Sequence, residues 1–375
     1  MLGLLAFTGL AFANSDCSTG PVYNLPPVAS NGTSQVDYIA AATGLNGPHV
    51  HPVNASAYDL WYFDVVDTAP NSNASVVLVF FDTPPGTFPF PPGSWNTSLL
   101  VTLAITFPNG TFASTTTEVG LATNATVVVD GEGSSGNWEG VGLNWTYDVV
   151  TGAYDVFFDS AQFDGIKGSI HFQPRGAARY PCGPGVPGQT MRLVPNAGYV
   201  NPLPDAVATV DLIVDGERLT FTGAGYHDQG WGPQPFSSAV GSWYWGHGRV
   251  GPYSVVWFDI LTADGVEYVS TYVGKGDTAL VTSCDLASQQ VRPTGNNATF
   301  PPTSSSPKPS GYHITMDLGA EGVLDMNVSV VNQMFDLTEY MRAIAYINGT
   351  ITPPGGKPGP SMGGPALLEQ FALQA

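Results

Sequence analysis

Gly225-Tyr226-His227-Asp228-Gln229-Gly230-Trp231-Gly232 is the stretch on which the interpretation of this chain depends, and Ser242-Trp243-Tyr244-Trp245-Gly246-His247 follows it closely. Together they hold two of the six histidines and three of the eight tryptophans. Small-molecule sites are mostly apolar cavities with a few polar groups, and this mixture of aromatic and polar residues is typical of such a wall. The rest of the chain is expected to be the scaffold of that cavity.

Strand alternation assigns the second part of this stretch to two faces. Trp243, Trp245, His247 and Arg249 share one face, and Tyr244 lies on the other. If the strand belongs to a barrel, one face is the interior, and the two indoles and the imidazole would wall a pocket there. The alternative is that these side chains form the core of the barrel and that their polar atoms are hydrogen-bonded to neighbouring residues. The next strand adds Trp257 as a further wall residue.

His227 and Asp228 are neighbours, so in an extended strand their side chains point in opposite directions. A turn, which the flanking glycines would permit, is needed to bring them together. They could then serve as general acid and base, or hydrogen-bond a ligand carbonyl. Alternatively, Asp228 caps the following loop and His227 packs beneath it.

Two further strands carry candidate residues. In the first, Tyr62 and Asp64 share a face opposite Trp61 and Phe63, and either pair could face a site at a domain junction. In the second, Arg342 has the same parity as the sequon Asn348, so that face is expected to be exposed to solvent, and Arg342 is given little weight as a site residue.

Composition favours an all-β chain of two domains. The 375 residues include 45 Gly and 32 Pro with few charges, which favours short strands and turns. Alternation and short apolar runs predict strands at 58–66, 75–82, 98–107, 125–130, 140–149, 153–163, 165–173, 207–214, 218–223, 242–250, 253–261, 266–273, 311–318, 322–330, 340–348 and 367–371. The Pro/Gly-rich segment 174–205 is the predicted boundary. It separates residues 14–205, which begin with an extended arm, from 206–375, whose strands suit a closed antiparallel barrel.

Charge and hydropathy exclude several classes of partner. The net charge of −19 repels nucleic acid and anionic membrane surfaces. Residues 1–13 are apolar and end in small residues, which predicts a signal peptide. Beyond them no apolar run approaches the ~20 residues of a membrane span.

Ten N-x-S/T sequons predict passage through the secretory pathway and N-glycans on the surface. They are Asn31, Asn54, Asn73, Asn96, Asn109, Asn124, Asn144, Asn297, Asn327 and Asn348. Of three cysteines in a secreted chain, one pair is expected to form a disulfide; Cys17 with Cys182 is one guess, which would leave Cys284 free. No metal site is expected, since His49-Val50-His51 lacks an acidic or cysteine partner nearby.

The motif Gly225-Tyr226-His227-Asp228-x-x-Trp231-Gly232 with Trp243-x-Trp245-Gly246-His247 resembles the hydroxyneurosporene synthase-like (AttH-like) lipocalin superfamily, and most closely its fungal Diels–Alderase and hetero-Diels–Alderase branch. The resemblance spans about residues 58–373 and includes Trp61-Tyr62-Phe63-Asp64 and the closing segment 363–371. It implies a sandwich-like N-terminal β domain, a lipocalin-like barrel, and a ligand pocket at or between them. Here Gln229-Gly230 replaces the bulkier polar pair that relatives often carry, so the pocket's polar rim is expected to differ.

The resemblance also implies a cofactor-independent pericyclase of fungal secondary metabolism, which catalyses a [4+2] or hetero-[4+2] cycloaddition of a polyene or quinone-methide-type substrate. His227, Tyr226 or Tyr62 would donate the activating hydrogen bond, and the tryptophans would shape the cavity. One alternative is an isoprenoid hydratase or dehydratase with Asp228 and His227 as acid and base. The other is a non-catalytic carrier of an apolar metabolite.

Overall fold

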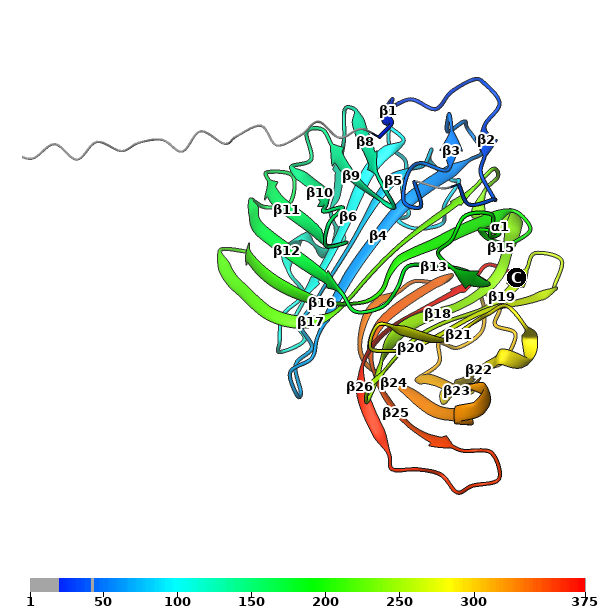
Figure 1. Cartoon of the computed structure of the whole chain (residues 1–375). Coiled ribbons are helices and arrows are strands. Elements are labelled where there is room, and N and C mark those ends of the chain that lie inside the picture. Colours follow the sequence, from blue (N-terminus) through cyan, green and yellow to red (C-terminus); the bar gives the residue numbers. More distant parts are fainter. Residues whose placement is uncertain (1–19, 42–43, 375) are drawn as a thin grey trace, which may run out of the picture.

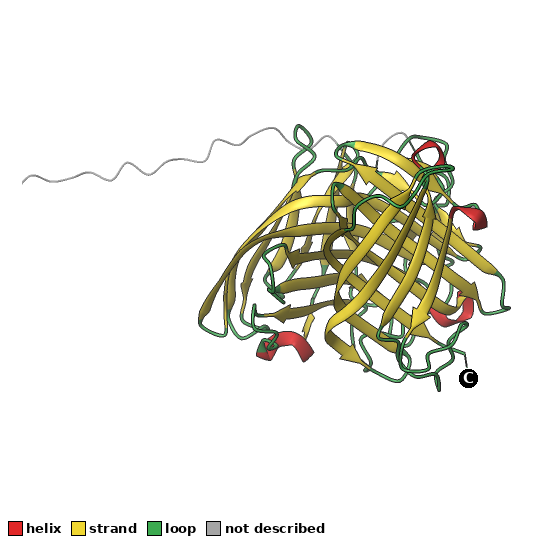
Figure 2. Cartoon of the chain, turned by 90° about the horizontal axis from the view of Figure 1, so that it is seen from below, coloured by secondary structure: helices red, strands yellow, loops and turns green. Residues whose placement is uncertain are grey.

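The computed structural model describes residues 20–41 and 44–374, and these residues form two large, curled antiparallel sheets (Figure 1; Figure 2). The all-β prediction is therefore confirmed. The predicted signal peptide and Cys17 lie outside the described residues. The one α-helix of the described part is the single turn α1 (Phe236–Ala239), and short 3-10 turns occupy Ser114–Thr117, Leu286–Ser288 and Gly319–Glu321.

The first sheet is built on β4 and its neighbours. Its main path runs β1-β8-β9-β10-β11-β12-β16-β17-β4-β5-β6-β7. The strands are β1 (Val22–Leu25), β4 (Tyr58–Asp67), β5 (Ser75–Asp82), β6 (Leu99–Thr106), β7 (Val119–Leu121), β8 (Ala125–Asp130), β9 (Gly133–Trp138), β10 (Leu143–Tyr147), β11 (Tyr154–Ser160), β12 (Ile166–Pro174), β16 (Ala197–Val214) and β17 (Glu217–Gly232). The short strands β13 (Arg179–Tyr180), β14 (Gly183–Pro184) and β15 (Arg192–Val194) attach to the side of β16, and β2 (Gln35–Val36) pairs with β3 (Val50–His51) apart from it.

The second sheet runs β21-β20-β19-β18-β26-β25-β24-β23-β22. Its strands are β18 (Val240–Val250), β19 (Tyr253–Thr262), β20 (Glu267–Lys275), β21 (Thr278–Ser283), β22 (Gln289–Thr294), β23 (Gly311–Asp317), β24 (Val323–Asp336), β25 (Tyr340–Thr352) and β26 (Met362–Ala372). The C-terminal strand β26 therefore lies in the middle of the sheet, between β18 and β25.

The change from one sheet to the other occurs after residue 232, not after the predicted residue 205. Strand β17 pairs with β4 from Gly223–Asp67 to Gly232–Tyr58, so residues 225–232 belong to the first sheet, whereas residues 242–247 lie in β18 of the second. The Pro/Gly-rich segment 174–196 is no linker, because its short strands fold back onto β16. The two sheets are joined through 233–239, which includes α1.

Three apolar clusters show how the faces are used. One lies inside the curl of the first sheet and contains Trp61, Phe63 and Trp145. Another lies inside the curl of the second sheet and contains Trp257. The third lies between the sheets and contains Tyr62, Tyr226 and Trp245 from both of them. The sheets therefore bury apolar surface against each other, and side-chain parity decides which residues reach that junction.

The face of β18 that carries Trp245, His247 and Arg249 turns toward the first sheet. The sequence places these residues on one face, and the structure agrees, but that face is not the barrel interior. His247 Nε2 lies 2.8 Å from Asp64 of β4, and Arg249 Nη2 lies 2.7 Å from Asp205 of β16. These two contacts, both buried or nearly so, hold the sheets against each other.

The disulfide joins Cys182 to Cys284, so the guess of Cys17 with Cys182 is wrong. Cys182 follows β13, which is attached to the first sheet, and Cys284 follows β21 of the second. The bond therefore links the two sheets across a sequence separation of 102 residues. Sequence spacing could not reveal this pair because it depends on how the sheets dock.

Candidate active site

An apolar cavity lies between the two sheets, at the junction where the third cluster packs. Its aromatic walls come from both sheets, from the loop between β5 and β6, and from α1: Tyr58, Tyr62, Phe81, Phe88, Phe90, Tyr199, Phe236, Trp243, Trp245, Tyr340 and Phe371. The charged residues of the wall are Asp228, Arg342 and Glu369. A mostly apolar cavity with a few convergent polar groups is the usual form of a small-molecule site.

Three hydrogen-bond donors in this wall have no partner among the residues that the structure describes. They are the Tyr62 hydroxyl and the indole nitrogens of Trp243 and Trp245, all buried. A buried donor left unpaired costs about 1–3 kcal/mol, so native proteins normally pair them. Three such donors around one cavity point to a ligand with oxygen acceptors.

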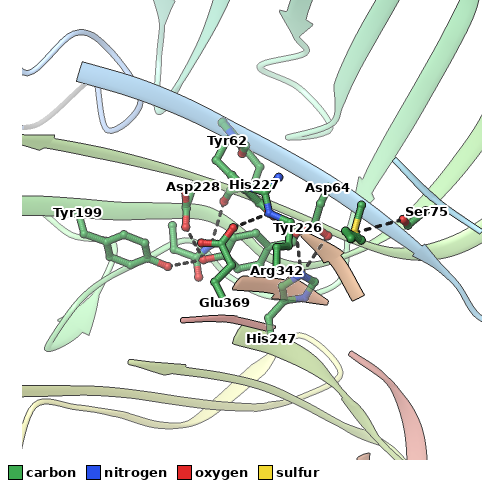
Figure 3. A network of polar contacts seen from close by, with 12 residues as sticks. Tyr62, Asp64, Ser75, Tyr199, Tyr226, His227, Asp228, His247, Arg342 and Glu369 are labelled. Carbon is green, nitrogen blue, oxygen red and sulfur yellow. Dashed lines mark hydrogen bonds and ion pairs between the residues drawn. The ribbon is translucent and has the colours of Figure 1, made fainter. Parts of the chain in front are cut away.

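Asp228 lies in the same wall and ends a chain of three hydrogen-bonded side chains (Figure 3). Tyr226 Oη donates to Asp228 Oδ2 at 2.7 Å, so the hydrogen bond of 2.6 Å between the two tyrosine hydroxyls is donated by Tyr199. Burial raises the pKa of Asp228 well above its ordinary value, and the Glu369 and Asp64 carboxylates add to the rise. The hydrogen bond from Tyr226 works in the opposite direction.

Burial in this apolar cavity therefore favours the neutral, protonated form of the Asp228 carboxyl group. Oδ2 accepts from Tyr226, so the acidic proton of Asp228 is carried on Oδ1. A carboxylic acid in this state can donate a hydrogen bond or a proton to a bound oxygen.

Arg342 and Glu369 form a buried ion pair in the wall of the same cavity, with 4% and 9% of their side chains exposed. Arg342 Nε donates to Glu369 Oε1 at 2.6 Å, and the Tyr340 hydroxyl donates to the same oxygen at 2.7 Å. The guanidinium also lies 5.5 Å from the ring of Tyr62. This pair places a fixed positive and a fixed negative charge at the wall.

Arg342 lies in the cavity wall, although its parity with Asn348 predicted a position exposed to solvent. Arg342 does share a face of β25 with Asn348, as parity requires, and Asn348 is exposed. Six residues of strand span about 20 Å, however. The first sheet covers the end with Arg342 and Ile344, and leaves Tyr346 51% exposed.

Asp64 and His247 lie beside the cavity but are not part of its wall. Both oxygens of Asp64 are within 2.9 Å of His247 Nε2, and the imidazole stacks on Tyr226 at 4.3 Å between centroids. Figure 3 shows this pair next to the Tyr226–Asp228 chain. Asp64 holds the imidazole of His247 in place, and the stacking of this imidazole on Tyr226 fixes the orientation of the Tyr226 ring.

His227 points away from the cavity, because β17 continues as a strand with no turn at its glycines. Its ring stacks on Phe63 at 3.7 Å, Nδ1 donates to the Tyr62 carbonyl at 2.7 Å, and Nε2 lies 3.0 Å from Asn46 Oδ1. Burial lowers the pKa of His227 to about 3, although the hydrogen bond to Tyr62 opposes this. The hypothesis of a His227–Asp228 dyad is therefore wrong.

Three of the predicted wall tryptophans also lie elsewhere. Trp61 packs in the first cluster and donates to the Asn46 carbonyl, while Trp257 packs inside the second sheet. Trp231 lies under the N-terminal arm and donates to the Asp37 carbonyl. In each case strand parity turns the indole to the other side of its sheet.

Sequence reasoning missed Tyr199, Tyr340 and Glu369 as site residues. For Glu369 a signal exists, since a lone carboxylate interrupts the apolar run Leu367-Leu368-Glu369-Gln370-Phe371. Charged residues are rarely buried unless they are paired. The two tyrosines carry no comparable signal because aromatic residues are common throughout the chain.

The described residues contain no group of three or more His, Cys, Asp or Glu side chains arranged to hold a metal ion. Within that part of the chain, no helix has the length and apolar character needed to cross a membrane.

Comparison with known proteins identifies the family. Residues 29–294 match the family model described as Diels-Alderase-like, so the chain belongs to the Diels-Alderase-like family and is an enzyme of the cyclase type. Over 345 residues it is 34% identical to the quinolone epoxide rearrangement protein asqO of Emericella nidulans, covering 91% of this chain and 90% of that protein. It is 27% identical over 189 residues to the Diels-Alderase phmD of Phaeosphaeria nodorum, which covers 49% of each chain.

The fold is shared with solved structures. CghA in complex with Sch210972 superposes with a TM-score of 0.73 at 15% identity, covering 94% of this chain and 99% of that chain. Kievitone hydratase from Nectria haematococca superposes with a TM-score of 0.54 at 13% identity, covering 93% and 98%. These likenesses confirm the lipocalin-like, two-sheet architecture that the sequence motif predicted.

Proposed function

We propose that this chain is an acid-type isomerase of fungal secondary metabolism that rearranges an epoxide on a flat, conjugated substrate such as a quinolone. The observation that carries the proposal is the position of the Asp228 carboxyl group in the wall of an aromatic cavity, where burial favours its protonated form. The quinolone class is suggested by the names of the two relatives that share 33–34% identity with this chain.

The reaction follows from the groups in the wall. Asp228 transfers its proton to the epoxide oxygen as one carbon–oxygen bond breaks. The faces of Trp243, Trp245 and Tyr62 stabilise the positive charge that develops on carbon. A neighbouring bond or π system then supplies electrons to that carbon, and a proton lost from the product returns to the Asp228 carboxylate. Substrate and product are isomers, and the enzyme is restored.

A [4+2] or hetero-[4+2] cycloaddition is the second candidate. The unpaired donors of Tyr62, Trp243 and Trp245 favour it, because donors that bind a conjugated carbonyl polarise the π system without transferring a proton. The shape of the cavity would hold the two reacting π systems together. The more distant relatives named as Diels-Alderases support this candidate.

A product assay distinguishes these functions and the alternatives left by the sequence. Purified protein is incubated with a synthetic quinolone epoxide and separately with a linear triene that bears a conjugated carbonyl, and products are followed by chiral chromatography and mass spectrometry. An epoxide-derived isomer of unchanged mass is the expected result. A gain of one water would instead indicate a hydratase, and tight binding without turnover a carrier; either result contradicts the proposal.

We propose that the protein passes through the secretory pathway. The Cys182–Cys284 disulfide is typical of an oxidising compartment, and none of the ten sequon asparagines is buried. Protein expressed in a filamentous fungus should lose mass on treatment with an N-glycosidase and show no free thiol at Cys182 or Cys284 on alkylation under denaturing conditions. An unchanged mass together with two free thiols would contradict this proposal.

A further inference from the structure

A second cavity adjoins the first. It is lined by Pro91, Pro92, Thr102, Leu103, Ala104, Thr116, Glu118, Val119, Phe335 and Leu337, and by Phe90 and Arg342, which also line the first cavity. The two cavities therefore share a wall that consists of these two side chains.

Phe90 forms this partition. It lies in the loop between β5 and β6 and is 6% exposed. Its ring packs against Tyr340 at 4.7 Å and Phe335 at 5.0 Å between centroids, and the Arg342 guanidinium lies 5.6 Å from it. Because these contacts are aromatic and not hydrogen bonds, the ring can turn aside without leaving a polar group unpaired.

The lining of the second cavity is mostly apolar and disfavours an anionic occupant. Most of it is hydrocarbon, and its cation, Arg342, is already paired with Glu369. Its carboxylate, Glu118, has a buried Oε2 without a partner, so an anionic group would be repelled there.

We propose that the two cavities form one bipartite binding site. The reacting core of the substrate lies in the first cavity against Asp228, and an apolar hydrocarbon arm of the same molecule extends past Phe90 into the second. Phe90 is then the residue that sets the length of arm the enzyme accepts. This inference rests on the proposed function for the identity of the core, but the position of the arm is testable without turnover.

The test uses quinolin-2(1H)-one and its 4-methyl, 4-butyl and 4-octyl derivatives as probes, with binding followed by quenching of tryptophan fluorescence. Trp243 and Trp245 line the first cavity and report on the core. Burial of each additional CH₂ tightens binding by up to about fourfold. The dissociation constant is therefore expected to fall along the series in the unaltered protein.

Two variants locate the arm. Leu337 lines the second cavity but not the first and is 37% exposed, so Leu337→Trp fills the chamber without overpacking a core. It should weaken binding of the octyl probe at least tenfold, roughly the loss of two or three buried CH₂ groups, and leave the parent quinolone unchanged. Phe90→Ala removes the partition and should tighten binding of the butyl and octyl probes relative to the parent.

Equal affinity along the series, or an octyl probe unaffected by Leu337→Trp, would overturn the inference. If the parent quinolone does not bind but the dependence on arm length and its loss in Leu337→Trp remain, the second chamber is supported and the quinolone core of the proposed function is contradicted. Parent binding that is retained in Leu337→Trp shows that this variant is folded, and an unchanged far-UV circular dichroism spectrum shows the same for Phe90→Ala.

Discussion

Asp228→Asn is expected to lower kcat/KM for the epoxide by about 10³-fold, within the range that one general acid contributes. Asn keeps the size of the side chain and its Oδ1 can still accept from Tyr226, but the amide has no proton to transfer. Binding of an unreactive quinolone should change little, because the shape of the cavity is preserved. The loss should therefore appear in kcat and not in KM.

Asp59→Asn is the matched control for this substitution. Asp59 is also fully buried in the first sheet, and burial raises its pKa to about 8 even though Gln229 and the His49 backbone donate to it. It does not line the cavity. Equal losses in Asp59→Asn and Asp228→Asn would mean that the effect is structural. A loss of less than about tenfold in Asp228→Asn would favour the cycloaddition, in which the Tyr62, Trp243 and Trp245 donors suffice.

The same acid sets the dependence of rate on pH. Asp228 is active when protonated and its pKa is raised, so kcat/KM should be highest at low pH and fall as the pH rises through that pKa. The profiles of Asp59→Asn and Asp82→Asn should keep this limb, because these two buried acids, with pKa values raised to about 8 and about 7, take no part in the reaction. A rate independent of pH would argue for hydrogen-bond donors that do not titrate.

Glu369→Ala is expected to destabilise the protein by about 3–5 kcal/mol, because it leaves the Arg342 guanidinium buried without its carboxylate. The substitution also removes the acceptor of the Tyr340 hydroxyl, which donates to the same oxygen. Urea unfolding followed by far-UV circular dichroism measures the change in the free energy of unfolding. A change below about 1 kcal/mol would mean that water reaches the guanidinium.

The double variant Arg342→Met/Glu369→Leu separates the fold from the chemistry of this pair. Replacing a buried ion pair with apolar residues of similar volume is often neutral or stabilising, so most of the lost stability should return. If the pair positions the substrate, activity should not return with it. Recovery of both stability and rate would show that Arg342 and Glu369 are purely structural.

Much of the fold follows from local pattern, and the exceptions concern how the sheets meet. Alternating and apolar runs predicted β5 and β8 with their observed bounds, because a strand buried on one or both faces has a clear sequence signature. The boundary at residue 205 was wrong because Pro and Gly mark turns and not sheet membership. Pairing of β17 with β4 is a contact between segments about 160 residues apart, as in Tyr226 with Asp64. A single sequence contains no local pattern that reveals such a contact.

The candidate site was predicted in part for the same reason. Parity grouped Tyr62 with Asp64 and Trp243 with Trp245, and these groupings are confirmed by the contacts across the junction. Parity alone could not say which face of a curled sheet meets the other sheet. Trp61 and Trp257 were therefore assigned to a pocket although they pack inside their own sheets.

The infrared spectrum of the Asp228 carboxyl group shows whether this group is protonated in the cavity. The difference spectrum between the unaltered protein and Asp228→Asn, recorded at neutral pH in D₂O, isolates the vibrations of that one group. We expect the carbonyl band of a protonated carboxylic acid, which disappears only at high pH. Carboxylate stretching bands at neutral pH would show that Asp228 is ionised there, and the acid-catalysed account would then be wrong.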